Sequence, residues 1–168
     1  EIIELCAGAR KYRFAAVCIQ PAWVARAVRE LRSSSVKTCT VIGFPHGASL
    51  TPVKCSEAEQ ALKLGAEELD MVINVGALKS GNEDLVFTDI RCLAELVHQA
   101  SAVVKVILEM GSLKEQQKIT ACVLAKLAGA DFVKTSTGFG PAGADPVDVS
   151  LMHRVVGGEM GIKAAGGI

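Results

Sequence analysis

Four ionisable residues stand inside short apolar stretches, where a charge is costly to bury. They are Asp70 in "ELDMVI", Lys105 in "VVKVIL", Lys134 in "FVKTST" and Lys163 in "GIKAAG". Each follows an apolar residue near the start of its stretch, so we expect all four at about the same height on neighbouring β-strands. A parallel strand covered on both faces is normally a continuous apolar run. The matched charges therefore predict a layer of side chains that carries chemistry.

These residue types favour chemistry at a carbonyl group. Three lysines and one aspartate that converge in an apolar interior cannot all be comfortably charged, because burial and repulsion between like charges both lower the pKa of a lysine. A neutral lysine amine attacks a carbonyl carbon and forms a Schiff base. An aspartate can move protons directly or through water. The pattern predicts carbon–carbon bond cleavage or formation next to a carbonyl.

The remaining reactive side chains carry weaker predictions. Cys18 lies on an apolar stretch and is a candidate for contacting a substrate, although a buried packing role explains it more simply. His46 stands in the loop-like "FPHG", and His98 and His153 fall in helical patterns, so none is expected as an acid or base. No nucleophile elbow surrounds Ser136, which disfavours serine hydrolysis.

Composition excludes several classes of function. Of the 168 residues 50% are apolar and only 4% aromatic, and 18 Lys+Arg balance 18 Asp+Glu. That balance leaves no excess of positive charge for binding nucleic acid or an acidic membrane surface. No apolar run reaches the roughly 18 residues that span a bilayer, and no signal-peptide pattern opens the chain. We expect one domain over residues 1–168, with no nucleic-acid or membrane partner.

The six cysteines are scattered along the chain. None forms a Cys-x-x-Cys pair, and no histidine pair has the spacing of metal ligands. We therefore predict no metal and no cofactor. The simplest interpretation is a set of buried free thiols in a reducing compartment, the cytoplasm.

The apolar stretches alternate with helical patterns. Six β-rich stretches cover residues 14–21, 37–45, 68–76, 102–111, 131–138 and 161–167, and helical patterns cover 1–14, 21–31, 56–66, 82–100, 112–130 and 145–157. Pro21, Ser56, Ser112 and Asp145 stand where helices would begin. Ser56 and Glu59 also have capping-box spacing.

This alternation allows two architectures, a doubly wound open sheet or a (β/α)8 TIM barrel. No glycine-rich dinucleotide fingerprint follows a strand, which disfavours the open sheet. "LGAEELDMV" and "AGADFVKTS" form an internal repeat in which Gly65 matches Gly129 and Asp70 matches Lys134. Repeated units of a barrel place equivalent positions at similar depth and bring their side chains together inside. We predict a TIM barrel, an α/β fold, with about six of its eight βα units in this chain.

Three motifs, taken in order, resemble the deoxyribose-phosphate aldolase family. That family carries an Asp-x-Val-Ile-Asn strand, a Lys-Thr-Ser-Thr-Gly strand and a Lys-x-x-Gly-Gly strand. This chain has "LDMVINVG", "FVKTSTGFG" and "IKAAGGI". "VIGFPHG" and the "ILE" that ends stretch 102–109 extend the resemblance over essentially the whole chain. Each motif is weak alone, whereas their order and spacing together are specific.

The resemblance implies a class I aldolase, a carbon–carbon lyase that uses no metal. Its reaction is the reversible cleavage of 2-deoxyribose 5-phosphate to glyceraldehyde 3-phosphate and acetaldehyde, a step of deoxyribose catabolism. By match of motif, Lys134 is the Schiff-base nucleophile and Asp70 the acid/base that acts on the carbinolamine. Lys163 is the neighbouring cation that lowers the pKa of Lys134 and helps to move protons. Lys105 would help to bind or tune.

Further residues are implied around the substrate. The backbone amides of Gly138, Gly166 and Gly167 would help to hold the phosphate, since glycine permits a close approach and a helix N-terminus favours an anion. Thr137 and Cys18 are additional candidates for substrate binding. The expected partner is a small phosphorylated sugar, and we expect a homo-oligomer, first of all a dimer.

The resemblance also has departures. Relatives begin with a strand and end with a helix and a Gly-x-Ser strand, and neither is found in this sequence, so we expect a barrel without its first and eighth strands. Two alternatives stay open: a truncated barrel with impaired or no activity, and another class I barrel aldolase with a different carbonyl donor.

Overall fold

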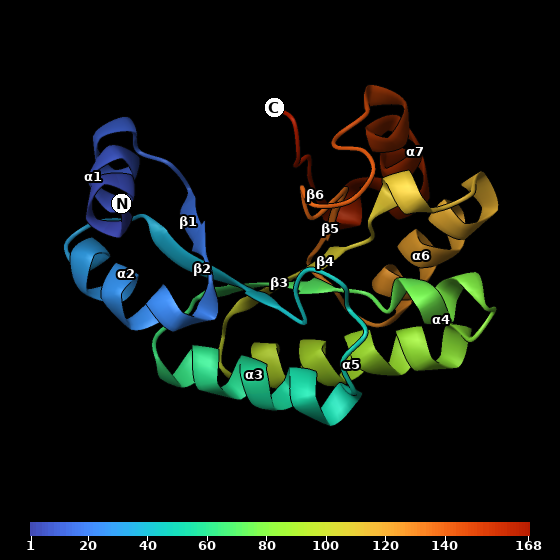
Figure 1. Cartoon of the computed structure of the whole chain (residues 1–168), viewed down its shortest axis with the longest axis horizontal. Coiled ribbons are helices and arrows are strands. Elements are labelled where there is room, and N and C mark those ends of the chain that lie inside the picture. Colours follow the sequence, from blue (N-terminus) through green and yellow to red (C-terminus); the bar gives the residue numbers. More distant parts are fainter.

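Six short strands form one parallel sheet in the computed structural model, which describes residues 1–168 (Figure 1). The strands are β1 (Ala16–Ile19), β2 (Lys37–Ile42), β3 (Glu68–Val72), β4 (Val103–Ile107), β5 (Phe132–Lys134) and β6 (Gly161–Lys163). They pair in strict sequence order, each parallel to the next. All six lie within the predicted stretches.

The strand order decides between the two predicted architectures. A doubly wound sheet reverses its strand order and carries helices on both faces. Here the order never reverses, so right-handed crossovers place the helices on one face. Figure 1 shows the sheet curling, with the helices along its outer side and β1 and β6 at its two ends. The TIM-barrel prediction is confirmed as a curled half-barrel of six strands.

Seven α-helices connect and flank the strands. They are α1 (Ile2–Tyr12), α2 (Val24–Leu31), α3 (Thr51–Lys63), α4 (Val75–Lys79), α5 (Glu83–Gln99), α6 (Glu115–Leu127) and α7 (Pro146–Val156). Short 3-10 turns occupy Pro21–Trp23, Met110–Ser112 and Gly157–Glu159. The helical patterns are confirmed. Helix α4 is an additional helix, which begins at the end of the predicted stretch 68–76 and continues into the loop after it. No helix combines the length and the apolar character that crossing a bilayer requires.

Two of the predicted helix starts are wrong. Helix α3 begins five residues before Ser56, with a proline in its first turn, so Ser56 lies inside the helix and caps nothing. Ser112 lies in a 3-10 turn, and the cap of α6 is Lys114. Asp145 is confirmed as a cap, because its side chain accepts a hydrogen bond from the Val147 amide at 2.7 Å. The first turn of a helix tolerates proline, so α3 can begin at this position without a serine cap.

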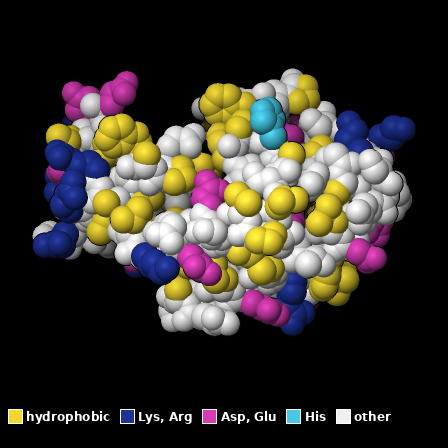
Figure 2. Space-filling view, turned by 60° about the horizontal axis from the view of Figure 1, so that its bottom comes forward, with side chains coloured by type: hydrophobic (Ala, Val, Ile, Leu, Met, Phe, Trp, Pro, Cys, Tyr) yellow, Lys and Arg dark blue, Asp and Glu magenta, His cyan; other side chains and the backbone are white.

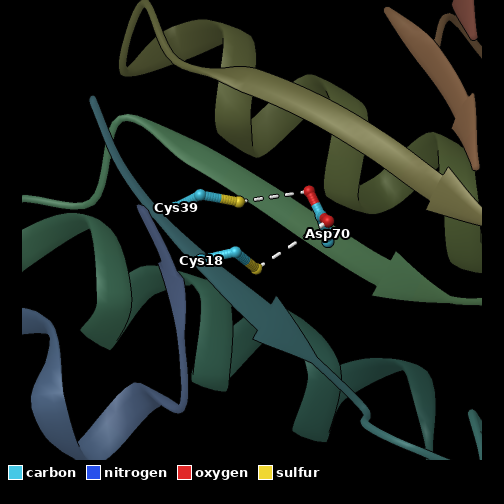
Figure 3. A group of neighbouring side chains, drawn as sticks. All are labelled: Cys18, Cys39 and Asp70. Carbon is cyan, nitrogen blue, oxygen red and sulfur yellow. Dashed lines mark hydrogen bonds between the residues drawn. The ribbon is translucent and has the colours of Figure 1, made fainter. Parts of the chain in front are cut away.

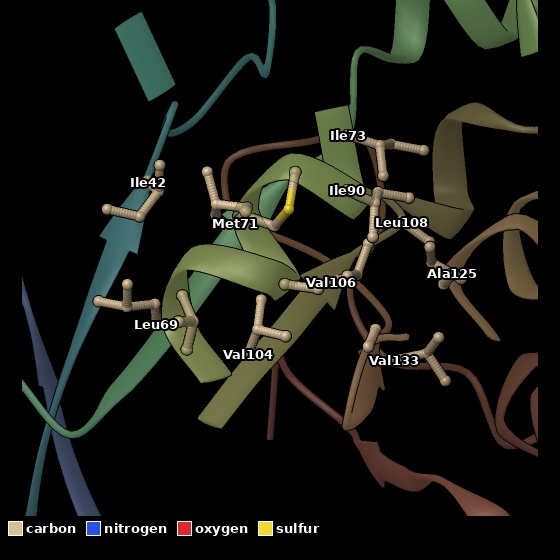
Figure 4. Packing of buried hydrophobic residues seen from close by; sticks show 14 of the residues in the cluster. Ile42, Leu69, Met71, Ile73, Ile90, Val104, Val106, Leu108, Ala125 and Val133 are labelled. Atoms are coloured by element: carbon tan, nitrogen blue, oxygen red, sulfur yellow. The ribbon is translucent and has the colours of Figure 1, made fainter. Parts of the chain in front are cut away.

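The outward side of the sheet forms the core. Successive strand residues alternate between faces, so Leu69 and Met71 of β3 and Val104 and Val106 of β4 point the same way. Figure 4 shows these side chains packed with Ile90 of α5. Asp70, between Leu69 and Met71, must therefore face the concave side. The apolar alternation in the sequence thus fixes which residues line the inside of the curl.

The helix ends repeat as predicted. Gly65 and Gly129 both have positive φ, +99° and +87°, and each stands three residues before the strand that follows, β3 or β5. Glycine adopts this conformation without the strain of a side chain. The two equivalent turns give β3 and β5 equivalent entries into the sheet.

Candidate active site on the concave face

Four strands present the predicted charged layer on the concave face. Asp70 of β3 is the register partner of Lys105 of β4, and Lys134 of β5 is the partner of Lys163 of β6. Lys134 also pairs with Ile107, two residues beyond Lys105 along β4. The second pair is therefore shifted by two residues along the strands, as barrel stagger requires. A shift of two keeps every side chain on the same face.

Asp70 is the centre of the cluster. Its Oδ1 accepts a hydrogen bond from Lys105 Nζ at 2.9 Å, and its Oδ2 accepts from Lys134 Nζ at 2.8 Å. Lys163 Nζ donates to the same Oδ2 at 2.7 Å. Asp70 is fully buried, and Lys105 and Lys134 nearly so, whereas the Lys163 side chain is 32% exposed. All four predicted catalytic and tuning residues are thus brought together, around one carboxylate.

The charges in this cluster stabilise one another. Burial alone would raise the pKa of Asp70, but the ammonium groups of Lys105, Lys134 and Lys163 outweigh it and hold that pKa well below its usual range. Burial would likewise lower the pKa of Lys163, yet the Asp70 carboxylate raises it. Asp70 is therefore an anion and Lys163 a cation at neutral pH.

Lys105 has a second acidic partner that the sequence analysis did not identify. Glu68 Oε2 lies 2.6 Å from Lys105 Nζ, and Glu68 faces the same side as Asp70 because it is two residues earlier on β3. Burial would lower the pKa of Lys105, but these carboxylates raise it above its ordinary value. Three lysines against two carboxylates leave one net positive charge, which favours an anionic ligand.

Two cysteines adjoin Asp70 (Figure 3). Cys39 Sγ donates to Asp70 Oδ1 at 3.2 Å, and Cys18 Sγ lies 3.9 Å from Oδ2. Hydrogen bonding between the two thiols lowers the pKa of Cys18 to about 7 and raises that of Cys39. The structure places Cys18 beside Asp70 and exposed, so the simpler expectation of a buried packing role is wrong for this residue.

The Cys18–Cys39–Asp70 group has the residue types of a metal site. Both carboxylate oxygens, however, already accept hydrogen bonds from lysine ammonium groups. A cation would have to displace these groups and would be repelled by them. The cluster therefore fits an anionic or carbonyl ligand better than a metal ion.

Lys134 lines a cavity of about 440 Å³. Its wall includes Cys18, Phe44, Thr137 and Phe139. The rings of Phe44 and Phe139 pack edge to face with centroids 5.6 Å apart. Figure 2 shows the molecule hollowed between its α1–α2 end and the remainder, with charges of both signs scattered over that face. The buried nucleophile candidate is thus accessible to a small ligand.

Thr137 is held by a residue that the sequence analysis did not assign a role, Glu109. The Glu109 carboxylate accepts hydrogen bonds from the hydroxyl and the amide of Thr137. Its other oxygen, Oε1, is buried without a partner. A Cβ on Gly140 would lie 2.6 Å from that oxygen, so a side chain at Gly140 would displace the carboxylate. The sequence signal for Glu109 was its position as the acidic residue that ends the apolar stretch "VKVILE".

The predicted phosphate-binding glycines lie where strands β5 and β6 end. Gly138, Gly166 and Gly167 all have positive φ, at +86°, +89° and +74°. A Cβ on Gly166 would be only 3.5 Å from the Gly138 Cα, so these two turns are in contact. Ala165 links the same turns, because its carbonyl accepts from the Thr135 hydroxyl at 3.0 Å. The structure thus brings these two glycine turns together beyond Lys134 and Lys163.

The three histidines lie away from the cluster, as expected. His46 is exposed in a turn, and His98 and His153 are exposed on helices. His98 contacts Asp131 at 3.0 Å. None contacts Asp70 or its lysines.

The fold and the cluster together define the class of protein: a TIM-barrel protein whose concave face presents buried lysines around an aspartate. Comparisons with known proteins give the family. Residues 1–168 match the sequence family described as DeoC/LacD family aldolase. The chain belongs to this family and is an aldolase, a lyase.

Individual relatives agree with this assignment. A deoxyribose-phosphate aldolase of Geobacillus sp. (strain WCH70) is 53% identical over 168 residues, which cover 100% of this chain and 75% of the relative. One from Streptococcus pneumoniae is 53% identical over 167 residues, 99% of this chain and 75% of the relative.

Solved structures show the same fold. A protein of Coccidioides immitis superposes with a TM-score of 0.95 at 46% identity, over 99% of this chain and 66% of that one. The tetrameric deoxyribose phosphate aldolase of Aeropyrum pernix gives 0.91 at 34% identity, over 99% of this chain and 70% of that one. The chain thus spans two thirds to three quarters of these longer relatives.

Proposed function

We propose that this chain performs the Schiff-base chemistry of a deoxyribose-phosphate aldolase, the reversible cleavage of 2-deoxyribose 5-phosphate to glyceraldehyde 3-phosphate and acetaldehyde. The observation that carries the proposal is the sharing of one carboxylate oxygen. Lys134 Nζ and Lys163 Nζ both donate to Asp70 Oδ2, beside a cavity that Lys134 lines. Lys163 Nζ thus places a second positive charge on the carboxylate oxygen that Lys134 contacts, and these like charges repel each other.

Lys134 is proposed as the nucleophile. It is the only lysine of the cluster that lines the cavity, and its proton has an acceptor in Asp70. Once neutral, its nitrogen attacks the carbonyl carbon of the open-chain sugar, and the carbonyl oxygen takes up a proton to give a carbinolamine. Loss of water from the carbinolamine then gives the protonated Schiff base, the electron sink for carbon–carbon cleavage.

Asp70 and Lys163 are proposed to move the protons. Asp70 is ionised in the free site, so its first step is to accept a proton, and it donates only after that. Lys163 stays cationic because Asp70 raises its pKa. It supplies both the positive charge beside Lys134 and a proton for the leaving hydroxyl. Lys105, paired with Glu68 and Asp70, is proposed to fix the position of the carboxylate.

Binding of the sugar phosphate is proposed at the glycine turns. The net positive charge of the cluster favours an anion, and Gly138, Gly166 and Gly167 offer backbone without a side chain to obstruct it. Thr137, held by Glu109, is positioned to contact the sugar from the cavity wall. We further propose a homo-oligomer and a cytoplasmic location; the Aeropyrum pernix relative is described as tetrameric.

The test is cleavage of 2-deoxyribose 5-phosphate, followed by coupled reduction of the glyceraldehyde 3-phosphate released. Purified chain should release this product, and Lys134→Ala should release none. The matched control is Lys63→Ala, which removes an exposed lysine of α3. Aldol addition with acetaldehyde, but not with pyruvate or dihydroxyacetone phosphate, separates this proposal from another class I aldolase. A folded chain without cleavage or addition would contradict it.

A further inference from the structure

Two thiols meet on the outer surface of the half-barrel, across the sheet from the charged cluster. Cys55 of α3 and Cys92 of α5 have their sulfur atoms 2.8 Å apart. Cys92 is exposed and Cys55 is partly exposed, so a small reagent can reach the pair. By contrast, Cys6 and Cys122 are buried and have no thiol partner.

The two helices hold this geometry through buried contacts next to the thiols. Lys54, beside Cys55, forms a fully buried ion pair with Asp89 of α5 at 2.6 Å. Thr51 also donates to Asp89. Asp89 and Cys92 are three residues apart and share a helix face. The thiols are therefore held together by neighbouring interactions, and joining them requires little movement of either helix.

We propose that Cys55 and Cys92 form a reversible disulfide on exposure to a small-molecule disulfide such as oxidised glutathione. The Cys92 thiolate attacks one sulfur of the reagent, which releases one reduced thiolate and leaves a mixed disulfide on Cys92. Cys55 then loses its proton to solvent, and its sulfur attacks Cys92 Sγ, which expels the second thiolate. Two protein thiols are oxidised to one disulfide, and one reagent disulfide is reduced to two thiols.

The order of attack follows from the two environments. Burial, followed by the interaction with Cys92, raises the pKa of Cys55 to about 12. Asp89 and Glu59 add to this shift. Cys55 is therefore a poor first nucleophile near neutral pH, and exposed Cys92 is the point of entry. Closure by Cys55 should accelerate as pH rises.

The crosslink would change stability rather than chemistry at Lys134. It closes a loop between residues 55 and 92, which restricts the unfolded chain. The pair lies on helices outside the sheet, whereas Asp70 faces the inside. Oxidation should raise the melting temperature by roughly 5–10 °C and leave Schiff-base formation at Lys134 unchanged.

The experiment exposes the whole folded chain to oxidised glutathione and then counts free thiols and maps disulfides by mass spectrometry. Residues 55 and 92 should both lose their free thiols and appear in one crosslinked peptide pair, and the mapping separates this loss from any glutathione adduct on exposed Cys18. Dithiothreitol should restore both the count and the original melting temperature. Cys55→Ser should stop at a glutathione adduct on Cys92.

Cys18→Ser is the matched control, because Cys18 and Cys39 are the other close thiol pair. This variant should still form the 55–92 crosslink and still gain thermal stability. The proposal is overturned by a persistent adduct on Cys92 in the unaltered chain, by a crosslink at other cysteines, or by six free thiols after exposure. Each outcome is read without aldolase activity, so it does not depend on the proposed function.

Discussion

Asp70 is the residue whose charge the whole cluster shares. It is fully buried and accepts hydrogen bonds from three ammonium groups. Its sequence position, two residues into an apolar strand, already indicated a carboxylate that must be paired. The sequence did not indicate that all three lysines would reach the same carboxylate, because their contacts depend on barrel stagger between distant strands.

Asp70→Asn should destabilise the chain by about 3–5 kcal/mol, because it leaves buried lysines without their counter-charge. The loss should be read from urea unfolding at neutral pH. The pKa of Asp70 is lowered in the fold, so its contribution is present above the ordinary carboxyl pKa and is lost as pH falls below it. The stability gap between wild type and variant should therefore shrink in acid. A constant gap would contradict the charge interpretation.

Lys163→Leu tests the repulsion between two ammonium groups. Leucine removes the second cation from Asp70 Oδ2, and with it the positive charge that repels the Lys134 ammonium group. The rate of Schiff-base formation at neutral pH should fall by at least tenfold, and its pH optimum should move upward. Lys126→Leu, which removes a lysine of α6 paired with Glu159, is the control. An unmoved pH profile would argue against activation by Lys163.

Gly140→Ala tests the positioning of Thr137 by Glu109. The added Cβ would lie 2.6 Å from Glu109 Oε1 and should push the carboxylate away from Thr137. We expect a several-fold higher KM for 2-deoxyribose 5-phosphate with a smaller change in kcat, measured in the coupled cleavage assay. Gly158→Ala, where a Cβ meets nothing within 4 Å, should leave KM unaltered. Equal KM values for both variants would remove Glu109 from the site.

At the scale of elements, helix α3 and helix α5 are joined by a charge pair that contributes to the fold. Lys54 also donates to the Val72 carbonyl at 3.2 Å, so the pair ties both helices to the end of β3. This tie was hidden from sequence reasoning, since Lys54 lies in a segment without an apolar pattern. Lys54 lies in the first turn of α3, which begins five residues before its predicted start.

Lys54→Met should cost about 3–5 kcal/mol, because Asp89 is then buried without a counter-charge. The double variant Lys54→Met/Asp89→Leu should recover much of that loss, since replacing a buried pair by apolar side chains is often close to neutral. Urea unfolding of the two variants measures both values. A double variant no more stable than the single one would show that the pair is not an isolated electrostatic unit.

Element boundaries were predictable where side chains signal them locally. Asp145 caps α7 by a hydrogen bond to the backbone, and Gly65 and Gly129 end helices by their conformation. Ser56 failed as a cap because a serine can equally occupy a helix interior when earlier residues begin the helix. Glu68 was missed as a partner of Lys105 because cross-strand pairs require the register, which the sequence does not contain.

At the scale of the molecule, strand order determines where chemistry can occur. Six strands in sequence order curl with their helices outside, so the residues opposite the core face one shared interior (Figure 1). The alternation of apolar stretches with helical patterns predicted this architecture, and the ionisable residues inside four of those stretches predicted the charged layer. The size of the cavity at Lys134 was not predictable, because it depends on Phe44 and Phe139 from distant loops.

The central claim, that Lys134 is a Schiff-base nucleophile, is tested most directly by reductive trapping. The chain is incubated with acetaldehyde and borohydride, digested, and mapped by mass spectrometry. We predict one ethylated lysine, Lys134, with no label in Lys134→Ala and strongly reduced labelling in Asp70→Asn. Labelling of Lys105 or Lys163 instead, or no labelling of a demonstrably folded chain, would contradict the account.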